Sequence, residues 1–164
     1  MKILITAFAC AVLGLSAAVA QGPEPHAPVS PTHRLHLVAY MPDLGDIMET
    51  AQLRHFKLSY AGSAKNWMLA DYELGQIRKS LRETAKLYPN FANVPMAKLI
   101  HDISEPALDR VDEAIKAHDA DGFVRTFAKL TEACNSCHQA AGFGFIVIRV
   151  PTASPFSNQL FPPR

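Results

Sequence analysis

The chain has 164 residues, a length typical of a single domain with its own hydrophobic core. It carries 16 basic and 15 acidic side chains, which gives a formal net charge of +1 at pH 7 with histidine counted as neutral. Nothing in this balance suggests the strongly basic face with which nucleic-acid-binding proteins neutralise phosphates, so we expect no nucleic-acid partner.

Residues 1–20 have the pattern of a secretory signal peptide. Lys2 precedes an apolar stretch that is short for a membrane span, and the segment closes with an Ala-Val-Ala cleavage signal. Cleavage would remove Lys2 and Cys10, so the mature chain would carry 15 basic and 15 acidic residues and keep only Cys134 and Cys137 as thiols. We therefore expect export to an oxidising compartment, the periplasm.

Between residues 43 and 141 the apolar residues recur every three or four positions, which is the period of amphipathic helices. Four helices are predicted here. Asp43 caps the first, Pro89 ends the second, Pro95 opens the third and Asp121 begins the fourth. Without any alternation of strands and helices, the predicted fold class is all-α, a four-helix bundle.

One of these helices contains a proline in its interior. The run Ser104-Glu105-Pro106 in the third helix has the features of a helix start, because proline suits a first turn and interrupts a helix interior. We expect a break or kink at this point.

The two ends of the mature chain are expected to be irregular arms. Residues 21–42 form a proline-rich N-terminal arm without apolar periodicity, and residues 142–164 form a C-terminal tail. The tail contains enough apolar side chains to pack on the bundle. One hypothesis pairs residues 145–150 with 35–40 as a short β pair.

The fourth predicted helix carries the run Cys134-Asn135-Ser136-Cys137-His138. Because a helix rises ~1.5 Å per residue, the two thiols and the imidazole lie within about one turn. This Cys-x-x-Cys-His spacing is typical of c-type haem attachment, with the thiols adding to the two vinyl groups and the imidazole at the iron. We predict one covalent haem c per chain, and a hydrogen-bond acceptor for the second ring nitrogen of His138.

Other chemistries of the two cysteines are less well supported by the sequence. A structural zinc site needs about four ligands, and no further cysteine remains in the mature chain. A thioredoxin-like site needs its Cys-x-x-Cys at a helix start, whereas this pair falls near a helix end, where the dipole disfavours a thiolate. A thiol or interaction module using Cys134 and Cys137 is the non-haem alternative.

With this motif on the last of four predicted helices, residues 43–141 resemble the class II c-type cytochromes, which are cytochrome c′-like four-helix bundles. The resemblance implies thioethers at Cys134 and Cys137, His138 as the proximal axial ligand, and a homodimer paired through the first helices. The resemblance is to a divergent branch of that family, because 26 residues follow His138 and no basic residue comes soon after it.

The sixth coordination position separates two functions. Class II cytochromes take their distal residue from the first helix, and this chain offers His55 and Met48 on one face, of which His55 is preferred. Either ligand would give six-coordinate iron suited to electron transfer. Leu44 and Ala51 share that face and would instead leave an open site. Trp67 on the second helix is a candidate for packing against the haem edge.

The sequence therefore predicts an exported monohaem cytochrome that passes single electrons between redox partner proteins. The alternative is a five-coordinate haem protein that binds nitric oxide or carbon monoxide. Since no acid/base pair stands out, we do not expect an enzyme.

Overall fold

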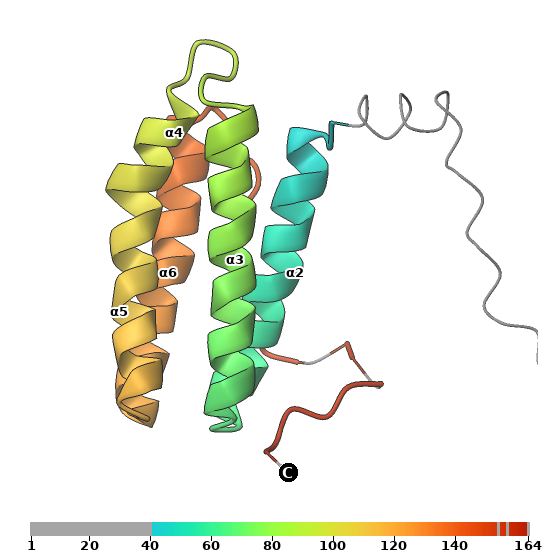
Figure 1. The fold of residues 1–164 in the computed structure, drawn as a ribbon, viewed down its shortest axis with the longest axis vertical. Helices are drawn as coiled ribbons and strands as arrows, with labels where there is room; N and C mark the ends of the chain where they lie inside the picture. Colours follow the sequence, from blue (N-terminus) through green and yellow to red (C-terminus); the bar gives the residue numbers. More distant parts are fainter. Residues whose placement is uncertain (1–40, 154, 157, 164) are drawn as a thin grey trace, which may run out of the picture. The chain divides into compact units, whose positions relative to one another are not determined.

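The computed structural model describes residues 41–153, 155–156 and 158–163, which Figure 1 shows in colour. The signal peptide predicted for 1–20, the N-terminal arm up to residue 40 and the first half of the hypothetical β pair lie outside the described residues. Within the described ranges, no helix has the length and apolar character needed to cross a membrane.

The described chain is helical, which confirms the all-α class. Its long helices are α2 (Leu44–Ser63), α3 (Trp67–Leu87), α5 (Glu105–Lys116) and α6 (Ala120–Ala140). A short helix, α4 (Met96–Leu99), and a π-helical turn, η1 (Ile100–Ser104), lead directly into α5. Apart from one bridge between Phe91 and Val94, the described residues contain no β pairing, and residues 145–150 form no strand there.

Acidic side chains cap the first and last helices by accepting hydrogen bonds from otherwise unpaired N–H groups. Asp43 caps α2 as predicted, since its Oδ1 accepts from the Gly45 amide at 2.7 Å. The start predicted at Asp121 for α6 is wrong. Asp119 is the cap, accepting from the Gly122 amide at 2.9 Å, because it has the extended backbone that a cap requires, while Asp121 lies inside the first turn.

The interruption expected near Pro106 is present: a π-helical turn ends at Ser104, and α5 begins at Glu105 with the proline in its first turn. Proline has no N–H to donate to the carbonyl four residues earlier, and its ring crowds that carbonyl. The ladder widens instead, and the Glu105 N–H donates to the carbonyl of Ile100, five residues back. Ser104 caps nothing, because its backbone is helical and its side chain makes no cap hydrogen bond.

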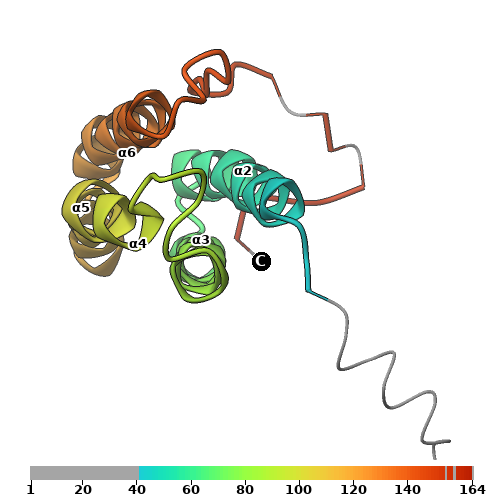
Figure 2. The same ribbon diagram turned by 90° about the horizontal axis from the view of Figure 1, so that it is seen from above.

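The long helices pack side by side around a common core (Figures 1 and 2). Helix α3 contacts α2 and α5, α5 contacts α6, and α6 contacts α2. The largest side chains in the core are almost fully excluded from water: Phe123, Leu58, Leu74, Leu108, Leu130 and Val111. Burial of each such side chain contributes ~1.5–3 kcal/mol, so this core supplies the main driving force for packing the helices together.

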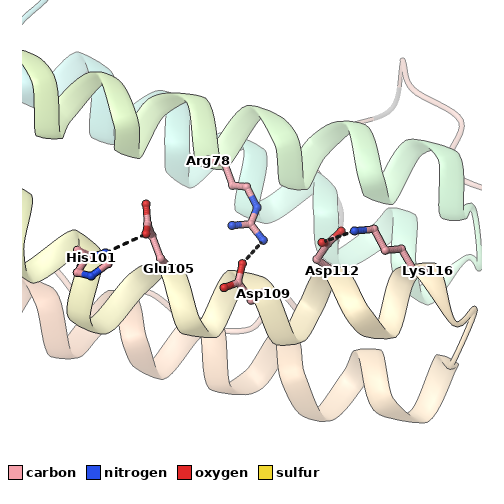
Figure 3. A network of polar contacts seen from close by, with 6 residues as sticks. All are labelled: Arg78, His101, Glu105, Asp109, Asp112 and Lys116. Carbon is pink, nitrogen blue, oxygen red and sulfur yellow. Dashed lines mark hydrogen bonds and ion pairs between the residues drawn. The ribbon is translucent and has the colours of Figure 1, made fainter.

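Ion pairs lie on the surfaces of α3 and α5, as Figure 3 shows. Arg78 on α3 pairs with Asp109 on α5 at 2.7 Å, and Lys116 pairs with Asp112 one turn away within α5. Because these pairs are largely exposed, water and salt screen them and each contributes little to stability. They help to set the register of the helices but do not drive folding.

The C-terminal tail contacts the C-terminal half of α2. Phe156 lies edge-on against Phe56, with ring centroids 5.4 Å apart. Phe161 is 8% exposed and packs on Tyr60, while its carbonyl accepts from the side-chain amide of Asn66 at 3.0 Å. Phe156 and Phe161 of the tail therefore pack against side chains of α2.

A glycine-to-alanine substitution tests the contact between α2 and α6. A Cβ at Gly62 would lie 2.1 Å from the Phe123 ring, which is buried and has no room to move. We expect Gly62→Ala to lower the free energy of unfolding by about 1–3 kcal/mol, measured by urea denaturation. Gly75→Ala in α3 is the matched control, since nothing lies within 4 Å of its Cβ. This control should stabilise by about 0.5–1 kcal/mol, and equal effects at both positions would contradict the packing described.

Candidate functional site

A cavity of about 420 Å³ opens between the N-terminal half of α2 and the C-terminal half of α6. Side chains from α3, α4, η1 and the segment after α6 complete its walls. The lining is predominantly apolar. It includes Leu44, Met48, Ala51, His55, Phe91, Ser104, Cys134, Cys137, His138, Phe143, Ile146 and Ile148. Its size falls within the usual range of small-molecule and cofactor sites, ~300–1,000 Å³.

The structure brings the three residues of the Cys-x-x-Cys-His motif to this cavity. Cys134, Cys137 and His138 come from the last two turns of α6, and all three line the wall. Cys137 is buried and Cys134 is half-buried, and both are free thiols. The apolar stripe predicted for this helix therefore ends in two thiols and an imidazole that line an apolar space.

Both thiols are held in their neutral form. Burial raises the pKa of Cys134 to about 11, and the neighbouring Cys137 adds to this effect. Burial also raises the pKa of Cys137, although a hydrogen bond from the Ser104 hydroxyl opposes the shift. Neutral thiols are poor nucleophiles and poor ligands for a bare metal ion. In keeping with this, the described residues contain no group of three or more His, Cys, Asp or Glu side chains suited to holding one.

The imidazole of His138 is oriented by a backbone carbonyl. Its Nδ1 lies 2.9 Å from the carbonyl oxygen of Ile146. A carbonyl can only accept, so Nδ1 carries the proton and Nε2 of the neutral ring keeps its lone pair. This is the arrangement found around metal-ligating histidines, in which the second nitrogen donates to an outer partner. The acceptor predicted from the sequence is thus the Ile146 carbonyl.

A sharp turn after α6 carries this carbonyl back to the motif. Gly142 has φ +81°, a left-handed conformation that favours glycine, and its amide donates to the Gln139 carbonyl. The Phe143 amide closes the turn by donating to the carbonyl of His138 at 2.7 Å. The following residues then run back past α6, where Phe143, Ile146 and Ile148 form part of the cavity wall.

The side chain of Asn135 fastens this returning segment. Its Nδ2 donates to the Ile148 carbonyl at 2.9 Å, and its Oδ1 accepts from the Ile148 amide at 2.7 Å. We call Asn135, His138 and residues 146–148 the motif clamp. The clamp was not anticipated from the sequence, since a paired amide at a variable position of the motif has no signature of its own.

Met48 and His55, the two candidates from α2, also line the cavity, but they differ in availability. His55 is 4% exposed, stacks on Phe127 at 4.5 Å, and has its Nε2 2.9 Å from the Thr131 hydroxyl. Since that hydroxyl donates to the Phe127 carbonyl, His55 Nε2 is the donor to Thr131. Burial lowers the pKa of His55 to about 4, so the ring is neutral at pH 7. Met48 is half-buried in the wall.

Trp67, which we expected to pack at the haem edge, does not line the cavity. Its ring stacks on His118 at 5.5 Å and lies edge-on to Phe123 at 6.3 Å. The physical reason is helix direction. The start of α3 lies next to the end of α2 across a short turn, whereas the cavity lies at the start of α2.

No family model, curated protein or solved structure matches this chain. The chemistry of the site therefore rests on the residues that form it.

The buried imidazole of His55 should make stability depend on pH. Its pKa is about 4 in the folded chain and 6.5 when unperturbed, so the unfolded chain binds the additional proton between these values. Stability should fall as the pH is lowered from 6.5 towards 4, with this histidine contributing up to roughly 3 kcal/mol of the loss. Urea denaturation across this range should show a smaller loss for His55→Gln than for the wild type. Identical losses in the two proteins would contradict the assignment.

Proposed function

We propose that the protein is an exported monohaem c-type cytochrome that transfers single electrons. The observation that carries this proposal is the arrangement of the Cys-x-x-Cys-His residues. Two free thiols and an imidazole share one wall of an apolar cavity, and the imidazole has its second nitrogen bonded to a backbone carbonyl. Thiol exchange and direct metal binding would each require thiolates, which burial disfavours here.

The residues present fit a haem group in three respects. The cavity volume of about 420 Å³ and its apolar walls suit a large, flat, mostly apolar cofactor. Cys134 and Cys137 are unpaired and would hold the cofactor by thioether bonds. The lone pair on His138 Nε2 would be the proximal ligand. Among the described residues no lysine or arginine lines the cavity, so carboxylates of an occupant would have no cationic partner inside it.

When bound, haem iron supplies a one-electron ferric–ferrous couple. The chain's own contribution is to exclude water with Phe91, Phe143 and Ile148, and to hold His138 in one tautomer. A fixed ligand and a dry, apolar surrounding both limit rearrangement when the charge of the site changes, which suits an electron carrier.

The distal ligand is assigned to Met48 rather than to His55. The Nε2 proton of His55 is engaged with Thr131, and the ring is stacked on Phe127, so ligation would cost these interactions. Met48 is on the same face of α2 and has a flexible side chain without a competing polar contact among the described hydrogen bonds. A methionine opposite His138 would give the six-coordinate iron of an electron carrier.

Binding of nitric oxide or carbon monoxide is the second candidate function. The observation that favours it is that Leu44 and Ala51 contribute apolar side chains to the α2 wall beside Met48. If Met48 remained in the wall as a packing residue, the distal side would be open to small gases.

The proposal also includes the finer fold and the location of the protein. The contacts of α2 with α3 and α6, and of α5 with α3 and α6, support a four-helix bundle of the class II cytochrome kind. The signal peptide pattern in residues 1–20 supports transport to the periplasm, where redox proteins would be the partners.

Absorption spectroscopy tests the function directly. Protein produced in a host that assembles c-type cytochromes should show a c-type α-band when reduced, and replacement of Cys134 and Cys137 by serine should abolish it. A wild-type protein without covalent haem would overturn the proposal.

Carbon monoxide distinguishes the two candidate functions and tests the distal ligand. We expect the spectrum of the reduced wild type to change little on addition of carbon monoxide, and that of Met48→Ala to change strongly because a coordination position is vacated. His55→Gln is the matched control on the same wall and should behave as the wild type. A strong spectral change in the wild type would contradict the electron-transfer proposal and favour gas binding as the function.

A further inference from the structure

Asn135 is placed to control the proximal ligand without touching the cofactor. It lies three residues before His138 on α6, so both side chains project from the same side of the helix. Asn135 binds both backbone groups of Ile148, and His138 binds the carbonyl of Ile146, two residues earlier. Ile146 and Ile148 are only two residues apart, so fastening Ile148 limits the positions that the Ile146 carbonyl can take.

Side-chain burial holds this segment only at one position. Phe145 is 80% exposed, Ile146 42% and Val147 66%, whereas Ile148 is 9% exposed. No strand of the described chain pairs with residues 145–150, so the segment lacks the ladder of hydrogen bonds that would hold an edge strand. The two bonds of the Asn135 amide are therefore the main polar attachment between this segment and α6.

We propose that Asn135 is a positioning residue that sets the reduction potential of the haem by holding the Ile146 carbonyl on His138 Nδ1. The proposal rests on the function proposed above. Donation of the Nδ1 proton to a fixed carbonyl makes the imidazole a stronger electron donor through Nε2. A stronger donor favours the ferric state, so the wild-type clamp lowers the potential. Loss of the clamp should raise it.

The test is a potentiometric titration of the haem-loaded wild type and of Asn135→Leu, which keeps the size of the side chain and removes both hydrogen bonds. We expect the potential of the variant to rise by ~59 mV, which is about tenfold in the equilibrium between the two oxidation states. Asn135→Ser, whose hydroxyl is too short to bind both groups of Ile148, should shift in the same direction and serves if the leucine variant does not accumulate.

Two control variants separate this effect from others at the site. Ser136→Ala changes the adjacent motif residue, whose hydroxyl donates to the Glu132 carbonyl away from the clamp, and should leave the potential unchanged. Ile148→Ala removes an apolar side chain from the cavity wall but leaves the backbone groups that Asn135 binds, so it reports the effect of packing alone.

Amide exchange of the same proteins supplies a second readout. The Ile148 amide donates to Asn135 in the wild type and should exchange faster in Asn135→Leu, while the Ile146 amide, bonded to the Phe143 carbonyl, reports on the turn itself. A potential within ~18 mV of the wild type, about a twofold change, would overturn the inference even if Ile148 exchanged faster. An equal shift in Ile148→Ala would also overturn it. A protein that carries no haem at all would contradict the proposed function, which the α-band reports separately.

Discussion

The hydrogen bond from His138 Nδ1 to the Ile146 carbonyl is the constraint on which the site depends. It fixes the tautomer of the imidazole and ties the last turn of α6 to the chain that follows it. The left-handed turn at Gly142 leads into this segment, and Asn135 binds both backbone groups of Ile148, two residues after the carbonyl. The segment after the helix is therefore a wall of the functional site. The residues that follow the motif, which the class II pattern lacks, form part of the cavity wall.

The same packing that forms the cavity sets the chemical state of the groups in it. Burial keeps both thiols and the His55 imidazole neutral, while Asp43 and Glu49 are the carboxylate residues among the lining. The π-helical turn before Pro106 acts in the opposite direction, because a hydrogen bond from Ser104 at its end lowers the pKa of Cys137. A predominantly apolar cavity with neutral thiols and an oriented imidazole differs from a redox dithiol or a zinc site, both of which depend on stabilised thiolates. It is the environment that a covalently attached, mostly apolar cofactor requires.

Much of the fold was predictable because helix periodicity and capping are local properties of the sequence. The cap at Asp43 and the apolar stripe through Phe127 and Leu130 could be predicted without tertiary information. Pro106 likewise indicated the interruption of the third predicted helix. The cap of α6 was predicted two residues too late, at Asp121, because Asp119 and Asp121 are both suitable cap residues. Only the backbone conformation distinguishes them. Within the site, the motif spacing indicated the residues of α6. The engagement of His55 with Thr131, the position of Trp67 and the clamp by Asn135 depend on contacts between distant segments, which no periodicity encodes.

The central claim is that Cys134, Cys137 and His138 form the attachment site of a haem. Mass spectrometry of the exported protein after trypsin digestion tests it most directly, because cleavage after Lys129 and Arg149 isolates the motif in one peptide, residues 130–149. We expect this peptide to carry the mass of one haem, bound through both cysteines. An unmodified peptide, or one with only an internal disulfide, recovered from a host that assembles c-type cytochromes, would contradict it.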